Sequence, residues 1–339
     1  MVSMENLLIA WDEFKKGKRE KTDVQIFERY LEDNLFRLHR DLIHKRYRHS
    51  EYTGFYIRDP KIRHIHKAQV RDRIVHHAIF QCLGSIFEPT FIPDSYSARI
   101  EKGTHKAVNR LRTFVRKVNQ TYGHCFILKC DVKKFFFSLD HQILFDIISQ
   151  HVKDSDVLHL IKTILKSFTS ELSTKNKLKG TPIGNLTSQL FANIYLNELD
   201  QFIKHKLKIS YYIRYTDDFV IVHQDEKYLL KIKNQISNFL KTRLKLSLHP
   251  DKVQIRKYKQ GIDFLGYVAL PKSRVLRTKM KRRIFRKLKQ RVKQFKNNEI
   301  KEESLIQSFN SYLGVLSHAN SHKLEQELRH KLWEWLKEP

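Results

Sequence analysis

The chain has 339 residues, with 65 Lys and Arg against 36 Asp and Glu, so its formal net charge is +29. Hydrophobic residues make up 41% of the sequence, which supports a folded core and excludes a disordered chain. So large a positive excess favours a polyanionic partner, and nucleic acid is the usual one, although acidic lipid is an alternative. No apolar run reaches about 18 residues, so we expect no membrane span.

The three cysteines, Cys82, Cys125 and Cys130, form no CxxC pair and have no spaced histidine pair beside them. A zinc site is therefore not expected. Free thiols in apolar surroundings fit a reducing compartment, and we expect a cytoplasmic protein.

The N-terminal part predicts two helices within residues 5–46, separated by a turn at residues 17–21. Thr22 or Asp23 is the expected N-cap of the second helix. Its expected apolar face consists of Ile26, Tyr30, Leu31 and Leu35.

Residues 51–66 alternate in polarity on either side of Asp59-Pro60, which predicts a hairpin. Helical spacing returns over residues 72–87, and a basic helix is expected over residues 104–118. The next expected element is a strand over residues 126–131, FILKCD, which ends in Asp131.

Beyond this strand, Asp140 is a suitable N-cap for a helix, and residues 187–207 predict another. Residues 211–222, YYIRYTDDFVIV, predict two strands joined by a tight turn that carries two Asp. A helix over residues 226–245 and short strands at 252–257 and 262–268 follow.

Residues 272–296 contain no acid and predict a basic helical region, the clearest subdomain boundary of the chain. Its expected apolar positions are Val275, Ile284, Leu288 and Val292. Residues 302–337 predict further helices.

Asp217 and Asp218 form an acidic pair at the expected turn. Two adjacent carboxylates repel each other unless cations neutralise them. Two hard cations about 3.5–4 Å apart would do so and would promote in-line phosphoryl transfer. Asp-Asp turns are common, so an ordinary surface turn is the alternative for this pair taken alone.

Asp131 supplies a third carboxylate at the end of an apolar strand. We therefore expect Asp131, Asp217 and Asp218 to be catalytic and, with Val132, to bind two Mg²⁺, which Mn²⁺ could replace. Phe136 follows five residues after Asp131, where an aromatic ring could exclude a 2′-hydroxyl and select deoxynucleotides. Core packing is the alternative for the run Phe135 to Phe137.

The ordered motifs resemble the reverse transcriptase family over about residues 50–270. They are IRHI at 62–65, DRIV at 72–75, PDSYSAR at 93–99, DVKKFFFSLD at 131–140, GTPIGNLTSQ at 180–189, YTDD at 215–218, LSLHPDK at 246–252 and GIDFLGY at 261–267. The resemblance implies an α+β right-hand polymerase that copies template RNA from dNTPs and binds an RNA–DNA duplex. Its expected parts are an N-terminal helical extension (1–50), fingers (51–125), a palm with inserted fingers elements (126–270) and a basic helical thumb (271–339).

Two groups of contact residues follow from this resemblance. The expected dNTP-binding residues are Arg63, Arg73, Phe135, Phe136, Ile183, Gly184, Gln189 and Lys252. The expected nucleic-acid-binding residues are Tyr96, Arg99, Tyr215, Phe264, Leu265, Gly266, Arg277, Lys281, Arg282 and Arg286. Arg suits bidentate contact with phosphate, and a solvated basic face is the alternative for each Arg.

The segment Ile183 to Gln189, IGNLTSQ, resembles the corresponding motif of diversity-generating retroelement reverse transcriptases. The resemblance implies a bacterial or phage-encoded protein, a structured noncoding template RNA, cDNA mutagenised at template adenines, and a small basic oligomeric accessory variability protein. Ile183 can only pack at a position where a Gln would form a hydrogen bond. The loss of that contact would reduce the free-energy difference between correct and incorrect base pairs.

Three alternatives to this reading remain open. A phage-defence reverse transcriptase would copy its own noncoding RNA, and a non-catalytic protein would bind RNA as a ribonucleoprotein component. An RNA-dependent RNA polymerase is disfavoured by Phe136.

Overall fold

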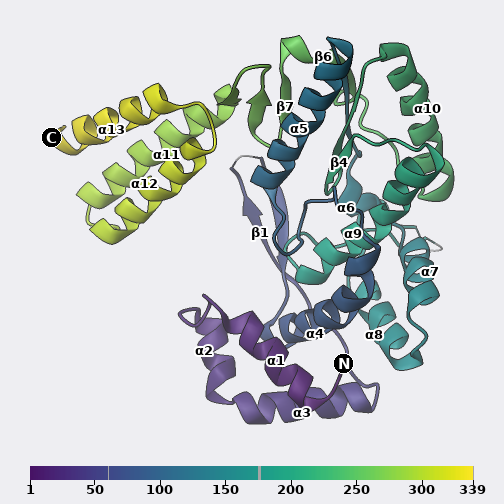
Figure 1. The fold of residues 1–339 in the computed structure, drawn as a ribbon. Coiled ribbons are helices and arrows are strands. Elements are labelled where there is room, and N and C mark those ends of the chain that lie inside the picture. The colour runs from purple at the N-terminus through teal and green to yellow at the C-terminus, as the bar shows by residue number, and fades with distance from the viewer. Residues whose placement is uncertain (60, 175–176, 339) are drawn as a thin grey trace. The chain divides into compact units, whose positions relative to one another are not determined.

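The computed structural model describes residues 1–59, 61–174 and 177–338 (Figure 1). Helices and antiparallel sheets share the chain, so the expected α+β class is confirmed. The chain divides into two compact units, which we describe separately. The first consists of Met1–Lys102, Lys129–Val220 and Leu230–Val253, and the second of Gly103–Leu128, Ile221–Leu229 and Gln254–Pro339.

The first unit begins with three helices that pack near a fourth. They are α1 (Met4–Lys15), α2 (Thr22–Arg29), α3 (Leu31–Ile43) and α4 (Val70–Phe87). The helix α1 packs on both α3 and α4, and α2 contacts the same two helices (Figure 1). The turn expected at residues 17–21 separates α1 from α2.

The prediction of one long second helix was wrong, because the backbone breaks at Tyr30 between α2 and α3. Neither Thr22 nor Asp23 is the N-cap, which is Lys21 without a side-chain hydrogen bond. Ile26 and Tyr30 are 62% and 55% exposed, so the predicted apolar face was wrong at these two positions, whereas it is confirmed at Leu35, which is 1% exposed. The short helix turns a different face inward: Val24 is buried, and the ring of Phe27 lies 5.5 Å from that of Trp11.

The predicted hairpin is confirmed by β1 (Thr53–Ile57) and β2 (Arg63–Lys67), which pair antiparallel. The expected Asp59-Pro60 turn includes Pro60, which lies outside the described residues. After α4 and the short η1 (Glu88–Thr90), the chain leaves this unit at Lys102.

The core of the first unit surrounds α9 (Leu186–Gln201), which is buried along most of its length and contacts α4 and α7. The remaining elements here are α6 (Phe135–Ser138), α7 (His141–His151), α8 (Ser155–Lys166), η2 (Phe202–Lys206) and β4 (Tyr212–Tyr215). The side chain of Asp140 accepts hydrogen bonds from the backbone of Gln142 and Ile143, so the predicted cap of α7 is confirmed.

A four-stranded sheet has the order β4-β5-β3-β6. Its strands β3 (Phe126–Asp131) and β5 (Asp218–His223) each run from one unit into the other, and β6 is Gln254–Lys257. The helix α10 (Glu226–Arg243) follows β5. The strand predicted to end in Asp131 and the strand-turn-strand predicted over residues 211–222 are both confirmed.

The described residues of the second unit form a three-stranded sheet and four long helices. Its further elements are α5 (Thr104–Tyr122), η3 (Tyr258–Gln260), β7 (Ile262–Phe264), β8 (Tyr267–Ala269), β9 (Arg274–Leu276), α11 (Thr278–Lys296), α12 (Glu302–Ser317) and α13 (His322–Lys337). Figure 1 shows α11, α12 and α13 side by side, and each contacts the other two.

The basic region at residues 272–296 is not helical throughout, which corrects the prediction at its start. Val275 lies in β9, the third strand of the antiparallel sheet, where it pairs with Val268 of β8. The other three predicted apolar positions, Ile284, Leu288 and Val292, form the buried face of α11 as expected. Among the described residues, no helix is both long and apolar enough to cross a membrane.

Buried His76 makes the stability of this fold depend on pH. Its ring nitrogens lie 2.8 Å from the Thr187 hydroxyl and 3.1 Å from His49 Nε2. Burial, and then the charges of His49 and His77, lower the pKa of His76 from 6.5 to about 3. The unfolded chain therefore binds the proton first, so this stability is present above pH 6.5 and lost as pH falls toward 3.

We expect the free energy of unfolding to fall by roughly 1.4 kcal/mol per pH unit below about pH 6.5 on account of His76. Urea midpoints measured at several pH values between 7.5 and 5 would test this. His76→Gln should flatten the dependence, whereas His205→Gln, at an exposed position of the same unit, should not. An unchanged slope in His76→Gln would contradict the assignment.

Candidate active site

The sheet brings the end of β3 beside the turn between β4 and β5. The backbone N–H of Val132 donates a hydrogen bond to the carbonyl oxygen of Asp217, 3.1 Å away. The carbonyl of Asp131 accepts one from His249 at 2.7 Å. These backbone bonds join three segments far apart in sequence, so they fix Asp131 and Asp217 near each other.

The turn itself has a strained residue at its tip. Thr216 has a φ of 53°, a left-handed conformation that costs a β-branched residue about 1–3 kcal/mol. Its hydroxyl donates to the Ser97 hydroxyl at 2.6 Å, and Arg214 Nη1 donates to its carbonyl at 3.2 Å. The surroundings therefore hold the turn that presents Asp217 and Asp218.

Behind the turn lies a buried ion pair that the sequence analysis missed. Arg214 Nη2 lies 2.6 Å from Asp200 Oδ2, and both side chains are 0% exposed. Tyr212 donates to the same carboxylate at 2.7 Å, and Arg214 also donates to Asn193 Oδ1 at 3.2 Å. A lone Arg within the apolar run YYIRY was the available signal, because a buried charge needs a partner.

The electrostatics of the three carboxylates differ. Burial, and next the negative charge of Asp131, raise the pKa of Asp217, while Lys252 and Arg63 act in the opposite direction. Lys252 Nζ is 2.8 Å from Asp131 Oδ1, and Lys129 Nζ is 3.8 Å from Asp218 Oδ2. Of the residues expected near the nucleotide, Lys252 thus contacts Asp131 directly, and the positive charge of Arg63 acts to lower the pKa of Asp217.

The donor set suits a hard cation. Carboxylate and backbone oxygens are the ligands that Mg²⁺ prefers, and positive charge here would relieve the repulsion that raises the pKa of Asp217. In the described parts of the chain, no three His, Cys, Asp or Glu side chains already form a cluster that could hold a metal ion. Lys252 and Lys129 instead lie against Asp131 and Asp218.

Backbone hydrogen bonds join the segments that carry two of the expected nucleotide-binding residues. The N–H of Thr181 donates to the carbonyl of Phe136 at 2.8 Å, and the N–H of His66 donates to the carbonyl of Ile183 at 3.1 Å. Gly184 has a φ of 120°, and a Cβ there would lie 2.9 Å from Ile65 Cγ2. The loop at 181–184 therefore joins α6 to the hairpin, with Phe136 and Ile183 half-buried and Gln189 exposed.

Two other residues expected at the nucleotide have different surroundings. Phe135 is 1% exposed and packs against the rings of Phe136 and Tyr195, so its side chain supports Phe136 from the core. Arg73 forms an ion pair with Asp23 and lies over the ring of Phe14, 4.9 Å from its centroid. Its contacts are with the N-terminal helices rather than with the carboxylates.

The expected template contacts around residue 96 are largely inside the fold. Tyr96 is 7% exposed, and its N–H donates to the carbonyl of Arg214. Arg99 binds Glu88 at 2.7 Å and donates to the carbonyls of Ile92 and Ser95, so it stabilises its own loop. Tyr215, which ends β4 beside the Asp pair, is half-buried.

The other expected nucleic-acid contacts belong to the second unit. Phe264 is buried, and Leu265 and Gly266 form the β7–β8 turn with φ values of 52° and 89°. Arg277 forms an ion pair with Asp263. On α11, Arg282 and Arg286 are exposed and Lys281 is half-buried, so the helix presents positive charge to solvent.

A palm-type sheet with carboxylates at the end of β3 and in the β4–β5 turn, together with the helices of the second unit, defines the fold of right-hand polymerases. Residues 57–269 match the family "Reverse transcriptase (RNA-dependent DNA polymerase)". The chain belongs to the reverse transcriptase family.

Curated proteins with similar sequences also match the chain. The chain is 26% identical to Protein YkfC of Escherichia coli over 61% of this chain and 63% of that protein. It is 27% identical to the group II intron-encoded protein LtrA of Lactococcus lactis, over 58% of this chain and 42% of that protein. The chain therefore spans less than two thirds of the length of these relatives.

A solved structure shares the fold. The apo telomerase from Candida tropicalis superimposes with a TM-score of 0.53 at 14% identity, over 85% of this chain and 57% of that one. This likeness supports the right-hand polymerase fold.

Proposed function

We propose that the protein is an RNA-directed DNA polymerase that extends a primer 3′-hydroxyl with dNTPs and releases pyrophosphate. The observation that carries the proposal is the pairing of Asp131 with Asp217 across the end of β3 and the β4–β5 turn. The Val132–Asp217 backbone hydrogen bond and the raised pKa of Asp217 both support it. The sequence match to the reverse transcriptase family agrees.

Asp131, Asp217, Asp218 and the backbone of Val132 would hold two Mg²⁺. Such ions supply charge neutralisation and Lewis acidity for nucleotidyl transfer when bound. Mn²⁺ could replace them. The proposed role of Lys252, beside Asp131, is to assist the departure of pyrophosphate, and that of Arg63 is to hold the triphosphate.

We also propose the division of the chain into an N-terminal extension (1–50), fingers (51–125), palm (126–270) and thumb (271–339). The exposed basic residues of α11 would grip the phosphates of an RNA–DNA duplex without reading its sequence. Of the other expected contacts, Gln189 is available at the surface, whereas Arg73 would first have to leave Asp23.

Primer extension on a primed RNA template with dNTPs and Mg²⁺ tests the activity. We expect DNA product that depends on the template, on Mg²⁺ and on all three Asp residues. Absence of product with generic RNA, with the cognate RNA and with the neighbouring accessory protein would overturn the proposal and favour a non-catalytic RNA-binding role.

Phe136→Ala is expected to admit ribonucleotides. The half-buried ring lies against the buried ring of Phe135, which fixes its position. Removal of a steric block of this kind is worth roughly 1–3 kcal/mol, so discrimination should fall about 10- to 100-fold. Single-nucleotide incorporation of dNTP and rNTP would measure it, with Phe137→Ala as the neighbouring control. Unchanged discrimination would remove Phe136 from this role.

At a finer level we propose a polymerase of a diversity-generating retroelement. The support is the segment IGNLTSQ at residues 183–189. Its template would be a repeat within a structured noncoding RNA, copied into cDNA with errors at adenines. A small basic oligomeric accessory variability protein would be its partner.

Ile183→Gln is expected to lower misincorporation opposite adenine by about tenfold, because a polar side chain restores a hydrogen bond worth about 1.4 kcal/mol. Sequencing of the cDNA from both proteins would measure the error rate. Ile183→Leu, which keeps an apolar side chain, is the matched control. Accurate copying by the unmodified protein would contradict the diversity-generating assignment and favour a defence role.

A further inference from the structure

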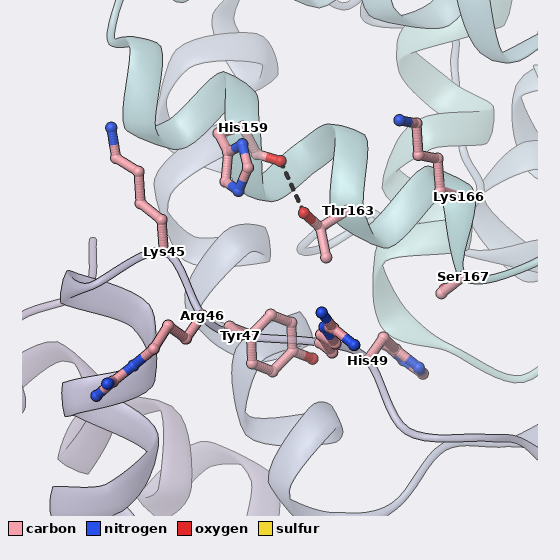
Figure 2. A pocket seen from close by; sticks show the side chains of 9 residues that line it. Lys45, Arg46, Tyr47, His49, His159, Thr163, Lys166 and Ser167 are labelled. Atoms are coloured by element: carbon pink, nitrogen blue, oxygen red, sulfur yellow. Dashed lines mark hydrogen bonds between the residues drawn. The ribbon is translucent and has the colours of Figure 1, made fainter.

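A basic cavity of about 730 Å³ lies between residues 45–49 and one face of α8 (Figure 2). Its lining side chains are Lys45, Arg46, Tyr47, Arg48, His49, His159, Thr163, Lys166 and Ser167. None of these is a carboxylate, and Lys45, Arg46, Arg48 and Lys166 carry positive charge. The hydroxyl groups of Tyr47, Thr163 and Ser167 already donate to other protein oxygens. The cavity therefore suits an anion through its positive charge.

A second cavity, also of about 730 Å³, lies along the adjacent face of α8. Five lysines line it: Lys162, Lys166, Lys177, Lys179 and Lys245. The one acid in the lining, Asp140, is 8% exposed and caps α7 through its side chain. Lys166 lines both cavities, so α8 has a cationic surface on both sides.

Most of these cations are available to a ligand. Within the described residues, no carboxylate pairs with Arg46, Arg48, Lys162 or Lys166. Lys45 is the exception, because it lies 2.6 Å from Asp156. Keeping so many like charges together is unfavourable without a counter-charge.

We propose that the two cavities form one track, the α8 track, for the phosphodiester backbone of RNA. A single phosphate would need only two or three of these cations. The cations here extend from residues 45–48 across α8 to residues 177–179 and Lys245. A set of cations spread in this way matches the repeated negative charges of a phosphodiester backbone.

The Tyr and Phe residues of the linings favour contact with phosphates over contact with bases. Tyr47 is buried and its hydroxyl donates to Asp72, while Lys162 Nζ lies over the ring of Phe145 at 4.3 Å. Neither ring offers the open face that base stacking uses. The track therefore binds RNA without reading its sequence.

The α8 track is distinct from the candidate active site. Neither lining contains Asp131, Asp217 or Asp218. The choice of RNA over other polyanions rests on the proposed function, whereas the cationic track itself does not.

The test is fluorescence anisotropy of an unprimed RNA hairpin with the full chain, without dNTPs, from 50 to 200 mM KCl. Lys162→Gln/Lys166→Gln should lower the slope of log Kd against log salt by about 1.4–1.8, since each phosphate contact contributes about 0.7–0.9. The control is Lys231→Gln/Lys241→Gln, which removes two exposed lysines from similar places in α10.

Lys162→Arg/Lys166→Arg should keep the slope of the unmodified protein, which would separate charge from packing. Equal slopes of log Kd against log salt for the α8 variant and its α10 control would overturn the proposal of the α8 track. A DNA hairpin and inorganic phosphate are tested as alternative ligands. If the α8 variant changes binding of only one of these and leaves binding of the RNA hairpin unchanged, the assignment to RNA is overturned. Because RNA binding is measured without DNA synthesis, the assay distinguishes a failure of the α8 track from a failure of the proposed polymerase activity.

Discussion

Replacement of Asp217 and Asp218 together by Asn is expected to reduce primer extension by about 10³-fold or more. These carboxylates would hold the charge that stabilises nucleotidyl transfer, a contribution of several kcal/mol. A loss of about 4 kcal/mol corresponds to about 10³-fold in rate. Product formed per minute on a primed RNA template, at saturating dNTP, would measure the loss.

Folding should survive this change. Burial and the charge of Asp131 raise the pKa of Asp217, so its negative charge is unfavourable where it lies and neutral Asn relieves the repulsion. We expect the melting temperature to be unchanged or higher. The matched control, Asp33→Asn/Asp146→Asn, neutralises two exposed acids and should extend primers normally. Full activity in the Asp217/Asp218 variant would refute the catalytic role.

Arg214→Met is expected to destabilise the protein by roughly 3–5 kcal/mol, because it leaves the fully buried carboxylate of Asp200 without its cationic partner. At roughly 2–4 °C per kcal/mol, the melting temperature should fall by on the order of 10 °C. Differential scanning calorimetry would measure the shift. The same variant removes a hydrogen bond to the carbonyl of Thr216, so residual activity should fall as well.

Two comparison variants make this result specific. Arg19→Met breaks an exposed ion pair with Glu28 in the same unit and should cost less than 1 kcal/mol. Arg214→Met/Asp200→Leu removes both charges and should be less destabilising than the sum of the single changes. A melting temperature for Arg214→Met within 2 °C of the Arg19→Met value would contradict the proposed role of the pair.

The sequence was most informative where the signals are local. Periodicity and turn residues predicted β3, the β4–β5 turn and the cap of α7 by Asp140, because each depends on residues close together in the chain. The order of these elements predicted that Asp131 would lie near Asp217. The sheet order and the Val132–Asp217 hydrogen bond agree with that expectation.

The features that the sequence did not reveal depend on contacts between residues that are distant in the chain. Arg214 meets Asp200 only because the end of α9 packs against β4, and the two residues are 14 positions apart. Arg73 looked like a phosphate ligand, but the N-terminal helices supply Asp23 as its partner. Val275 fits a helical pattern as well as a strand, and pairing with β8 decides between them. Periodicity alone cannot reveal such partners.

We propose that Asp131, Asp217 and Asp218 direct RNA-templated DNA synthesis. The most direct measurement is incorporation of single dNTPs opposite each base of a primed RNA template, with the unmodified protein and with Asp217→Asn/Asp218→Asn. We expect the unmodified protein to add the complementary dNTP in the presence of Mg²⁺, and the rate to fall by about 10³-fold or more in the variant. Equal incorporation by both proteins, or addition that ignores the template base, would contradict it.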